Sequence, residues 1–187
     1  MDTITGDDPD VAITISDGTF ASTSATLSAT DVSAVGGATT GTVTVSNAVK
    51  IVGAASDLTN TLVTSGSSVT ASTALVDISD GTFASTSATI AATVLGDIGA
   101  KTTGVVTVTK AAKIVGAASD LTNTLVTSGS SVIAATALVD ITDGTFASTS
   151  ATIAATVLGD IGAKTTGVVT VSTVSYTHLT LPTNLSV

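Results

Sequence analysis

Apolar and polar residues alternate along several short runs of the chain, and the run Val106-Thr107-Val108-Thr109 shows the alternation clearly. A period of two in residues such as Val, Ile and Thr is typical of β-strands. The segments 137–141 and 113–116 are also rich in Val, Ile and Leu and indicate two more strands. Pairs of such strands precede stretches with helical spacing, so the pattern predicts repeated strand–strand–helix units.

Two stretches predict helices, since their apolar residues recur at positions that share one helical face. The first is marked by Ile90, Val94, Leu95 and Ile98, and the second by Leu121, Leu125 and Val126. Residues 86–93 of the first stretch also fit a strand.

The limits of the second helix are predicted from its flanking residues. Ser119 or Asp120 is expected to cap its N-terminus with a side-chain oxygen, and Gly129 is expected to end it.

The pattern repeats with a period of 63 residues. Asp17-Gly18-Thr19-Phe20 returns at residues 80–83 and 143–146. Segment 77–108 differs from segment 140–171 only at Ser79 and Thr142. Copies this similar predict interchangeable structural units.

We therefore predict an α/β repeat solenoid over residues 11–173, with two coils per period, parallel strands and right-handed crossovers. An all-β solenoid is the alternative. Residues 1–10 form a separate acidic segment rich in Asp.

Three recurrent motifs support a resemblance to a known class of repeat proteins. They are Asp-Ile-Ser-Asp-Gly, then Gly-Ala-Lys-Thr-Thr-Gly-Val-Val-Thr, then Lys-Ile-Val-Gly-Ala-Ala-Ser-Asp-Leu. It resembles the Ala/Thr/Gly/Asp-rich tandem repeats of very large secreted or cell-surface proteins of cyanobacteria and other aquatic bacteria. The resemblance covers roughly residues 11–171 and implies an adhesin-like role at an extracellular location. It transfers no functional residue.

The end of the chain departs from the repeat. Residues 174–183 resemble the translation of a sequencing-library adapter, so segment 174–187 is expected to be non-native. This segment contains the only His and the only Tyr, His178 and Tyr176. We exclude it from functional inference.

Composition narrows the function further. All 14 acidic residues are Asp, the 5 basic residues are Lys, and the net charge is −9. Such a surface repels nucleic acid and anionic membranes. No run is long and apolar enough to span a membrane, and the first residues do not predict a signal peptide.

Catalysis has few candidate groups. Residues 1–173 contain no His, Cys, Tyr, Trp, Glu or Arg, so a Ser–His or Cys–His pair cannot form. We predict that the chain is not an enzyme and needs no cofactor. A polysaccharide-active β-helix that uses Asp alone is a minor alternative.

Aspartate is the one residue type that recurs in a pattern suited to a ligand. Asp77 and Asp80 return as Asp140 and Asp143 at the end of a predicted strand. Their oxygens are ligands that calcium favours, which makes these residues candidate metal ligands. The competing interpretation is turn formation, because Asp-Gly favours turns and Asp bonds the local backbone.

Other recurrent residues have structural interpretations. Phe20, Phe83 and Phe146 are expected to fill the core once per period, although exposed Phe would suit sugar stacking. Four Lys residues are interpreted as solvated charges that offset nearby Asp, namely Lys50, Lys101, Lys113 and Lys164. Thr-x-Thr and Thr-x-Ser pairs occur once per period, which is sparse for an ice-binding surface.

The sequence thus predicts a structural or adhesive spacer of a large extracellular repeat protein, with a calcium-binding repeat module as the alternative. Its expected partners are neighbouring repeats of the same protein. Because natural repeat arrays need polar terminal caps, we also expect self-association through an exposed C-terminal coil.

Overall fold

The computed structural model describes residues 10–16, 26–46, 49–80, 89–108, 112–127, 129–143 and 152–172. The predictions for the three Phe residues, for most of the acidic N-terminal segment and for segment 174–187 lie outside these residues.

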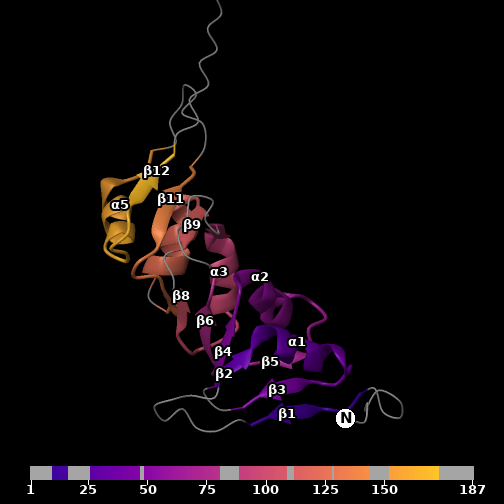
Figure 1. The fold of residues 1–187 in the computed structure, drawn as a ribbon. Helices are drawn as coiled ribbons and strands as arrows, with labels where there is room; N and C mark the ends of the chain where they lie inside the picture. Colours follow the sequence, from indigo (N-terminus) through magenta and orange to yellow (C-terminus); the bar gives the residue numbers. More distant parts are fainter. Residues whose placement is uncertain are drawn as a thin grey trace, which may run out of the picture.

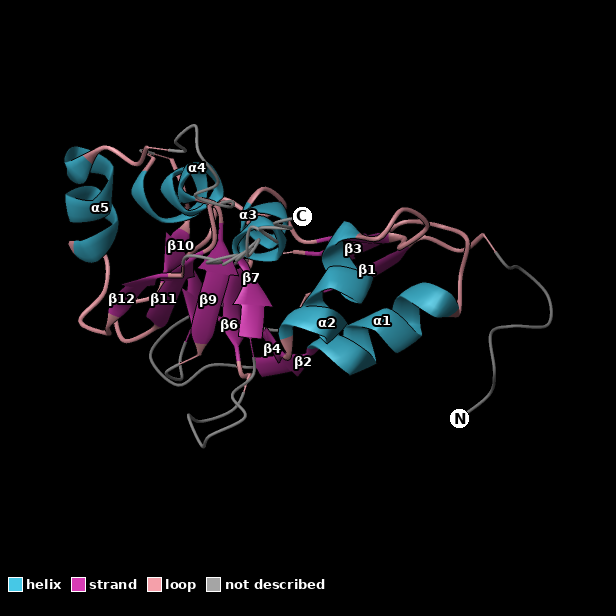
Figure 2. Ribbon diagram, turned by 90° about the horizontal axis from the view of Figure 1, so that it is seen from above, coloured by secondary structure: helices cyan, strands magenta, loops and turns pink. Residues whose placement is uncertain are grey.

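The described chain is an α/β structure of parallel strands in three sheets with helices between the strands (Figures 1 and 2). The strands are β1 (Ile13–Ile15), β2 (Thr26–Ser28), β3 (Val43–Val45), β4 (Lys50–Gly53), β5 (Val69–Thr70), β6 (Leu75–Ile78), β7 (Thr89–Ala91), β8 (Val106–Val108), β9 (Lys113–Gly116), β10 (Val132–Ile133), β11 (Leu138–Ile141) and β12 (Val169–Val171). Their orders are β1-β3-β5, β10-β8-β6-β4-β2 and β12-β11-β9-β7.

The helices follow one another along the molecule from α1 to α5, as the colour sequence in Figure 1 shows. They are α1 (Ala29–Gly37), α2 (Ala55–Leu58), α3 (Ala92–Gly99), α4 (Ala118–Leu121) and α5 (Ala155–Gly162). Helices α2 and α4 continue directly into π-helical turns, η2 (Thr59–Val63) and η3 (Thr122–Val126). Each helix contacts the next one in the chain, so segments from successive copies pack side by side.

Strand pairing joins segments that are distant in the sequence. Ile51 lies opposite Val76, and Val76 lies opposite Val106 on its other side. Every crossover between neighbours therefore contains other elements, such as α2, η2 and β5 between β4 and β6. Parallel strands need a long connection of this kind, which the helices provide.

The core extends through the described part of the chain and is built from strand and helix residues of successive copies. In β6 the alternating residues Val76 and Ile78 are fully buried. The helices contribute Leu58, Leu95 and Leu121, which are completely buried. Small β-branched side chains suit these short strands because they pack densely on a pleated surface.

The structure confirms the α/β prediction and rules out the all-β alternative. The predicted strands over 106–109, 113–116 and 137–141 are present as β8, β9 and β11, and the second predicted helix is present as α4 and η3.

The first predicted helix is shorter than its apolar spacing suggests. Ile90 belongs to strand β7, where it lies opposite Ile114, and the helix begins only at Ala92. The placement of Ile90 on the helical face is therefore wrong, and the alternative of a strand within residues 86–93 is confirmed for 89–91, which pair with β9.

Candidate functional site

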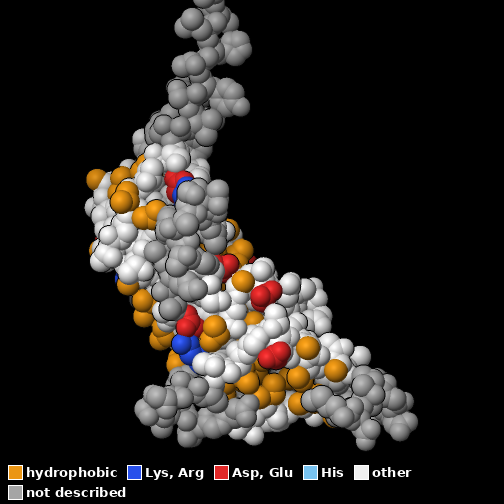
Figure 3. Space-filling model, viewed as in Figure 1, with side chains coloured by type: hydrophobic (Ala, Val, Ile, Leu, Met, Phe, Trp, Pro, Cys, Tyr) orange, Lys and Arg blue, Asp and Glu red, His pale blue; other side chains and the backbone are white. Residues whose placement is uncertain are grey.

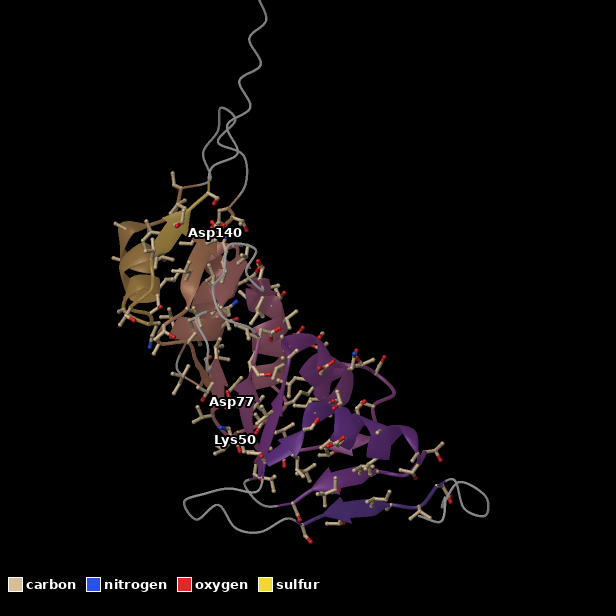
Figure 4. All side chains as sticks on the ribbon, in the orientation of Figure 1. Lys50, Asp77 and Asp140 are labelled. Carbon is tan, nitrogen blue, oxygen red and sulfur yellow. The ribbon has the colours of Figure 1, made fainter. Side chains whose placement is uncertain are left out.

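The recurrent Asp residues make two different kinds of contact. The first is an ion pair between neighbouring strands. Lys50 Nζ lies 2.7 Å from Asp77 Oδ2 (Figure 4), and Lys113 Nζ lies 2.7 Å from Asp140 Oδ2. Lys113 is opposite Leu138, so Asp140 is its diagonal neighbour on the same face of the sheet. Alternation along the strand thus places the two charges together.

In each ion pair the carboxylate is buried and the Lys side chain is partly exposed. Asp77 and Asp140 are each only 8% exposed, and the Lys side chains are about one-third exposed. The prediction that Lys50 and Lys113 offset nearby Asp residues is confirmed, and both Lys side chains are only partly exposed. Lys101 and Lys164 are exposed, as expected.

Asp140 has a second partner. The Ser172 hydroxyl donates to Asp140 Oδ1. The hydrogen bond from Lys113, followed by that from Ser172, lowers the pKa of Asp140 below its ordinary value, while burial opposes the shift. In the preceding copy, Asp77 Oδ1 is buried without a hydrogen-bond partner among the described residues. The residue equivalent to Ser172 there is Thr109, which lies outside them.

The second kind of contact is a hydrogen bond at the start of a short helix. The Ala118 N–H of α4 donates to Asp143 Oδ2 at 2.6 Å, and the Ala55 N–H of α2 donates to Asp80 Oδ2 at 2.6 Å. Each Asp thus caps a helix that begins 25 residues earlier in the chain. A carboxylate suits the N-terminus of a helix because free N–H groups point outward there.

This geometry corrects the predicted helix cap. The residue before α4 is Ala117, whose side chain cannot accept a hydrogen bond. The prediction of Ser119 or Asp120 as the N-terminal cap is therefore wrong. Gly129 does follow the helical segment, in a left-handed conformation with φ of 103°. A cap from another part of the chain leaves no local sequence signal.

The four predicted metal ligands do not converge. Asp77 and Asp140 contact Lys, whereas Asp80 and Asp143 contact helix N–H groups. No group of three or more acidic or His side chains in the described ranges is arranged to hold a metal ion. The predicted turn interpretation is also incomplete, because Asp80 and Asp143 bond a distant helix.

A shallow cleft recurs beside each capping Asp. The cleft at Asp143 has a volume of about 490 Å³ and the one at Asp80 about 430 Å³. At Asp143 the walls combine hydroxyl and amide groups of α4 and η3 with apolar residues at and just before α5, namely Ser119, Thr122, Asn123, Ile153 and Val157. Such a wall offers hydrogen bonds and apolar contact but no pair of groups for proton transfer among the described side chains.

A third recurrent feature, which the sequence analysis missed, is the Thr-Thr-Gly motif. The Thr102 hydroxyl donates to the Ala74 carbonyl at 2.5 Å and accepts from the Gly104 N–H at 2.9 Å. Thr39 and Thr165 make the equivalent bonds to the carbonyls of Val11 and Ala137. The recurrence of Thr-Thr-Gly every 63 residues was the available signal.

The fold and these contacts define an α/β protein of parallel strands whose copies are joined by the same interactions. Searches of protein-family models, curated proteins and solved structures found no match for the chain. Among the helices in the described part of the chain, none combines the length and apolar character needed to cross a bilayer.

Proposed function

We propose that the chain is a non-catalytic structural spacer: a right-handed solenoid of strand–strand–helix coils. The observation that supports this proposal is the recurrence of contacts between neighbouring coils. The ion pair of Lys50 with Asp77 returns 63 residues later as Lys113 with Asp140, at the same 2.7 Å separation. The helix caps return in the same way.

Recurrent contacts suit a spacer because each coil is held mainly by its neighbours. Stability then grows with the number of coils, and length grows without any new interface. The Thr61 hydroxyl donates to the Ala29 carbonyl at 2.9 Å, and Thr124 makes the same bond to Ala92 in the next copy. Both bonds join a π-helical turn to the preceding helix, so they bind one coil to the next.

An extracellular or cell-surface location and an adhesive role belong to the same proposal. Their support is the resemblance to the large repeat proteins described above and the net charge of −9, which suits a solvated surface. The partners in this proposal are neighbouring coils of the same protein.

Small-angle X-ray scattering tests the proposal. We expect a rod-like profile whose radius of gyration increases in proportion to length when one more 63-residue copy is inserted after Ser172. A compact profile with a radius of gyration near about 16 Å, the value that size scaling gives for a globular chain of this length, would contradict it.

The alternative function is a calcium-binding module, and the observation that favours it is Asp77 Oδ1, which is buried and has no hydrogen-bond partner among the described residues. Binding to the folded state alone must raise the melting temperature. A rise in melting temperature with about 1–5 mM calcium, lost in Asp77→Asn, would support this alternative. An unchanged melting temperature would leave the spacer proposal standing.

A further inference from the structure

Two segments of identical sequence, 89–108 and 152–171, have different surroundings in the structure. Leu95 is 0% exposed, whereas its counterpart Leu158 is only partly buried. Val108 is 3% exposed, whereas its counterpart Val171 is 37% exposed. Because the sequences are the same, the difference comes from what packs against each segment.

The second segment also lacks a strand that the first one has. Residues 89–91 form β7 and pair with β9, whereas residues 152–154 form no strand. Ile90 is 3% exposed, but the equivalent Ile153 is only partly buried. Residues 152–154 thus have the sequence of β7 but pair with no strand among the described residues.

The first segment shows what covers such a surface. Strand β9 pairs with β7, α4 and η3 pack on α3, and β10 pairs with β8. These elements all lie in the single coil of residues 112–134. The covering coil also makes a directed contact, since the Thr124 hydroxyl donates to the Ala92 carbonyl at 2.9 Å.

We propose that the apolar surface over α5 and β12 is a docking site for a coil with the sequence of residues 112–134. The surface, here called the C-terminal coil face, consists of Ile153, Ala155, Leu158, Val169 and Val171. Figure 3 shows exposed apolar side chains at the α5 end of the molecule. The inference rests on the coil stacking of the proposed function.

The register of the docked coil follows from the preceding copy. Ile114 lies opposite Ile90, so the docked Ile114 would lie opposite Ile153. Val132 lies opposite Val106, so the docked Val132 would lie opposite Val169 on the free edge of β12. The Thr124 hydroxyl would reach the Ala155 carbonyl. One coil would thus cover the apolar surface, pair with the edge of β12 and donate a hydrogen bond to the Ala155 carbonyl.

A second whole copy of the chain fits this surface less well. Its own coils of this sequence, around residues 50–70 and 113–133, are packed on both sides by neighbouring helices. They become available only if the copy opens. We therefore propose a separate coil as the occupant, and self-association of intact chains is a competing outcome of the test.

The test uses the full chain and a fluorescein-labelled peptide with the sequence of residues 112–134, measured by fluorescence anisotropy. We expect saturable binding with one peptide per chain. Leu158→Asp should weaken it by at least about tenfold, because the charge would be buried in an apolar contact. Circular dichroism of the variant checks that the fold is retained.

Val168→Asp is the matched control. Val168 is 66% exposed, and its counterpart Val105 stays 40% exposed although the next coil is in place, so this position lies outside the contact. Binding to this variant should change by less than about twofold. A peptide carrying Thr124→Val should bind more weakly than the parent peptide, because it cannot bond the Ala155 carbonyl.

Hydrogen exchange locates the bound peptide. Protection should rise at residues 152–172 and stay unchanged at 89–108. The proposal would be overturned if the peptide did not bind, if Leu158→Asp and Val168→Asp had equal effects on binding, or if protection rose elsewhere. It would also be overturned if sedimentation showed a dimer of intact chains that Leu158→Asp abolishes. If binding fails while scattering shows a rod, only the docking site is lost; a compact scattering profile would instead remove the proposed function.

Discussion

Asp140 and Asp143 are three residues apart, yet they stabilise different parts of the molecule. Asp140 points across the sheet to Lys113, and Asp143 reaches the first N–H of α4. The same division is present in Asp77 and Asp80. At the residue scale, recurrence of an acidic pattern therefore reflects two structural contacts within each copy.

The cap can be tested by Asp143→Ala. Removal of the acceptor leaves the Ala118 N–H without its partner, so the free energy of unfolding should fall by about 1 kcal/mol. Urea denaturation measures the change. Asp143→Asn retains an acceptor and should recover most of the stability, and Asp160→Ala on the exposed side of α5 should have little effect. Equal losses in all three variants would contradict the cap.

The ion pair predicts a dependence of stability on pH. The pKa of Asp140 in the folded state is lowered, so its contribution is complete above the unfolded pKa of about 3.9 and is lost as the pH falls through the folded value. Urea unfolding across this acidic range should therefore show a smaller loss of stability in Asp140→Asn than in the parent chain. Asp97→Asn, at an exposed position, is the control.

If Asp140→Asn lost as much stability at acidic pH as the parent chain does, other carboxylates would be the cause of that loss. Lys113→Ala should destabilise the chain more than the double change Lys113→Met with Asp140→Leu. The single change leaves a buried carboxylate without its cation, and the double change removes both charges.

At the scale of elements, the Thr-Thr-Gly motif sets how closely two neighbouring backbone segments approach. A Cβ on Gly104 would lie 2.1 Å from the Ala74 carbonyl oxygen, and one on Gly167 would lie 2.1 Å from that of Ala137. Only glycine allows the backbones to approach so closely. The hydroxyl of the first Thr then joins the same two segments.

Two glycine substitutions form a matched pair. Gly104→Ala should destabilise the chain by at least about 2 kcal/mol, because backbone atoms must move apart. Gly159→Ala in α5 should stabilise it by about 0.5–1 kcal/mol, since a Cβ there meets nothing within 4 Å and alanine favours a helix. Thermal unfolding compares the two. Similar effects of the two substitutions would show that the close approach at Gly104 is unimportant.

At the scale of the whole molecule, helix α5 is less buried than α3, although the two have the same sequence. Helix α3 buries Ala92, Leu95 and Ile98, whereas α5, with the same sequence, buries only Ile161. Helix α3 packs against helical segments on both sides, α2–η2 and α4–η3, whereas α5 packs against α4–η3 alone among the described helices. Packing, and not helix propensity, accounts for the difference.

Hydrogen exchange provides a direct test of this difference. Segments 89–108 and 152–171 have the same sequence and hence nearly the same intrinsic exchange rates, so any difference reports local stability. We expect slower exchange in 89–108 than in 152–171. Equal protection would show that the last coil is covered in solution, contrary to the exposure of Leu158 and Val171.

The sequence by itself determined the period, the strands with alternating apolar residues and the α4–η3 helix, because these depend on local spacing. It also identified Asp77, Asp80, Asp140 and Asp143 as recurrent. Only the tertiary structure decided their roles, since Asp143 caps a helix 25 residues earlier and Asp140 meets Lys113 across parallel strands. It also decided that Ile90 lies in a strand. These outcomes depend on which segments pair, and pairing between distant residues leaves no local pattern to predict it.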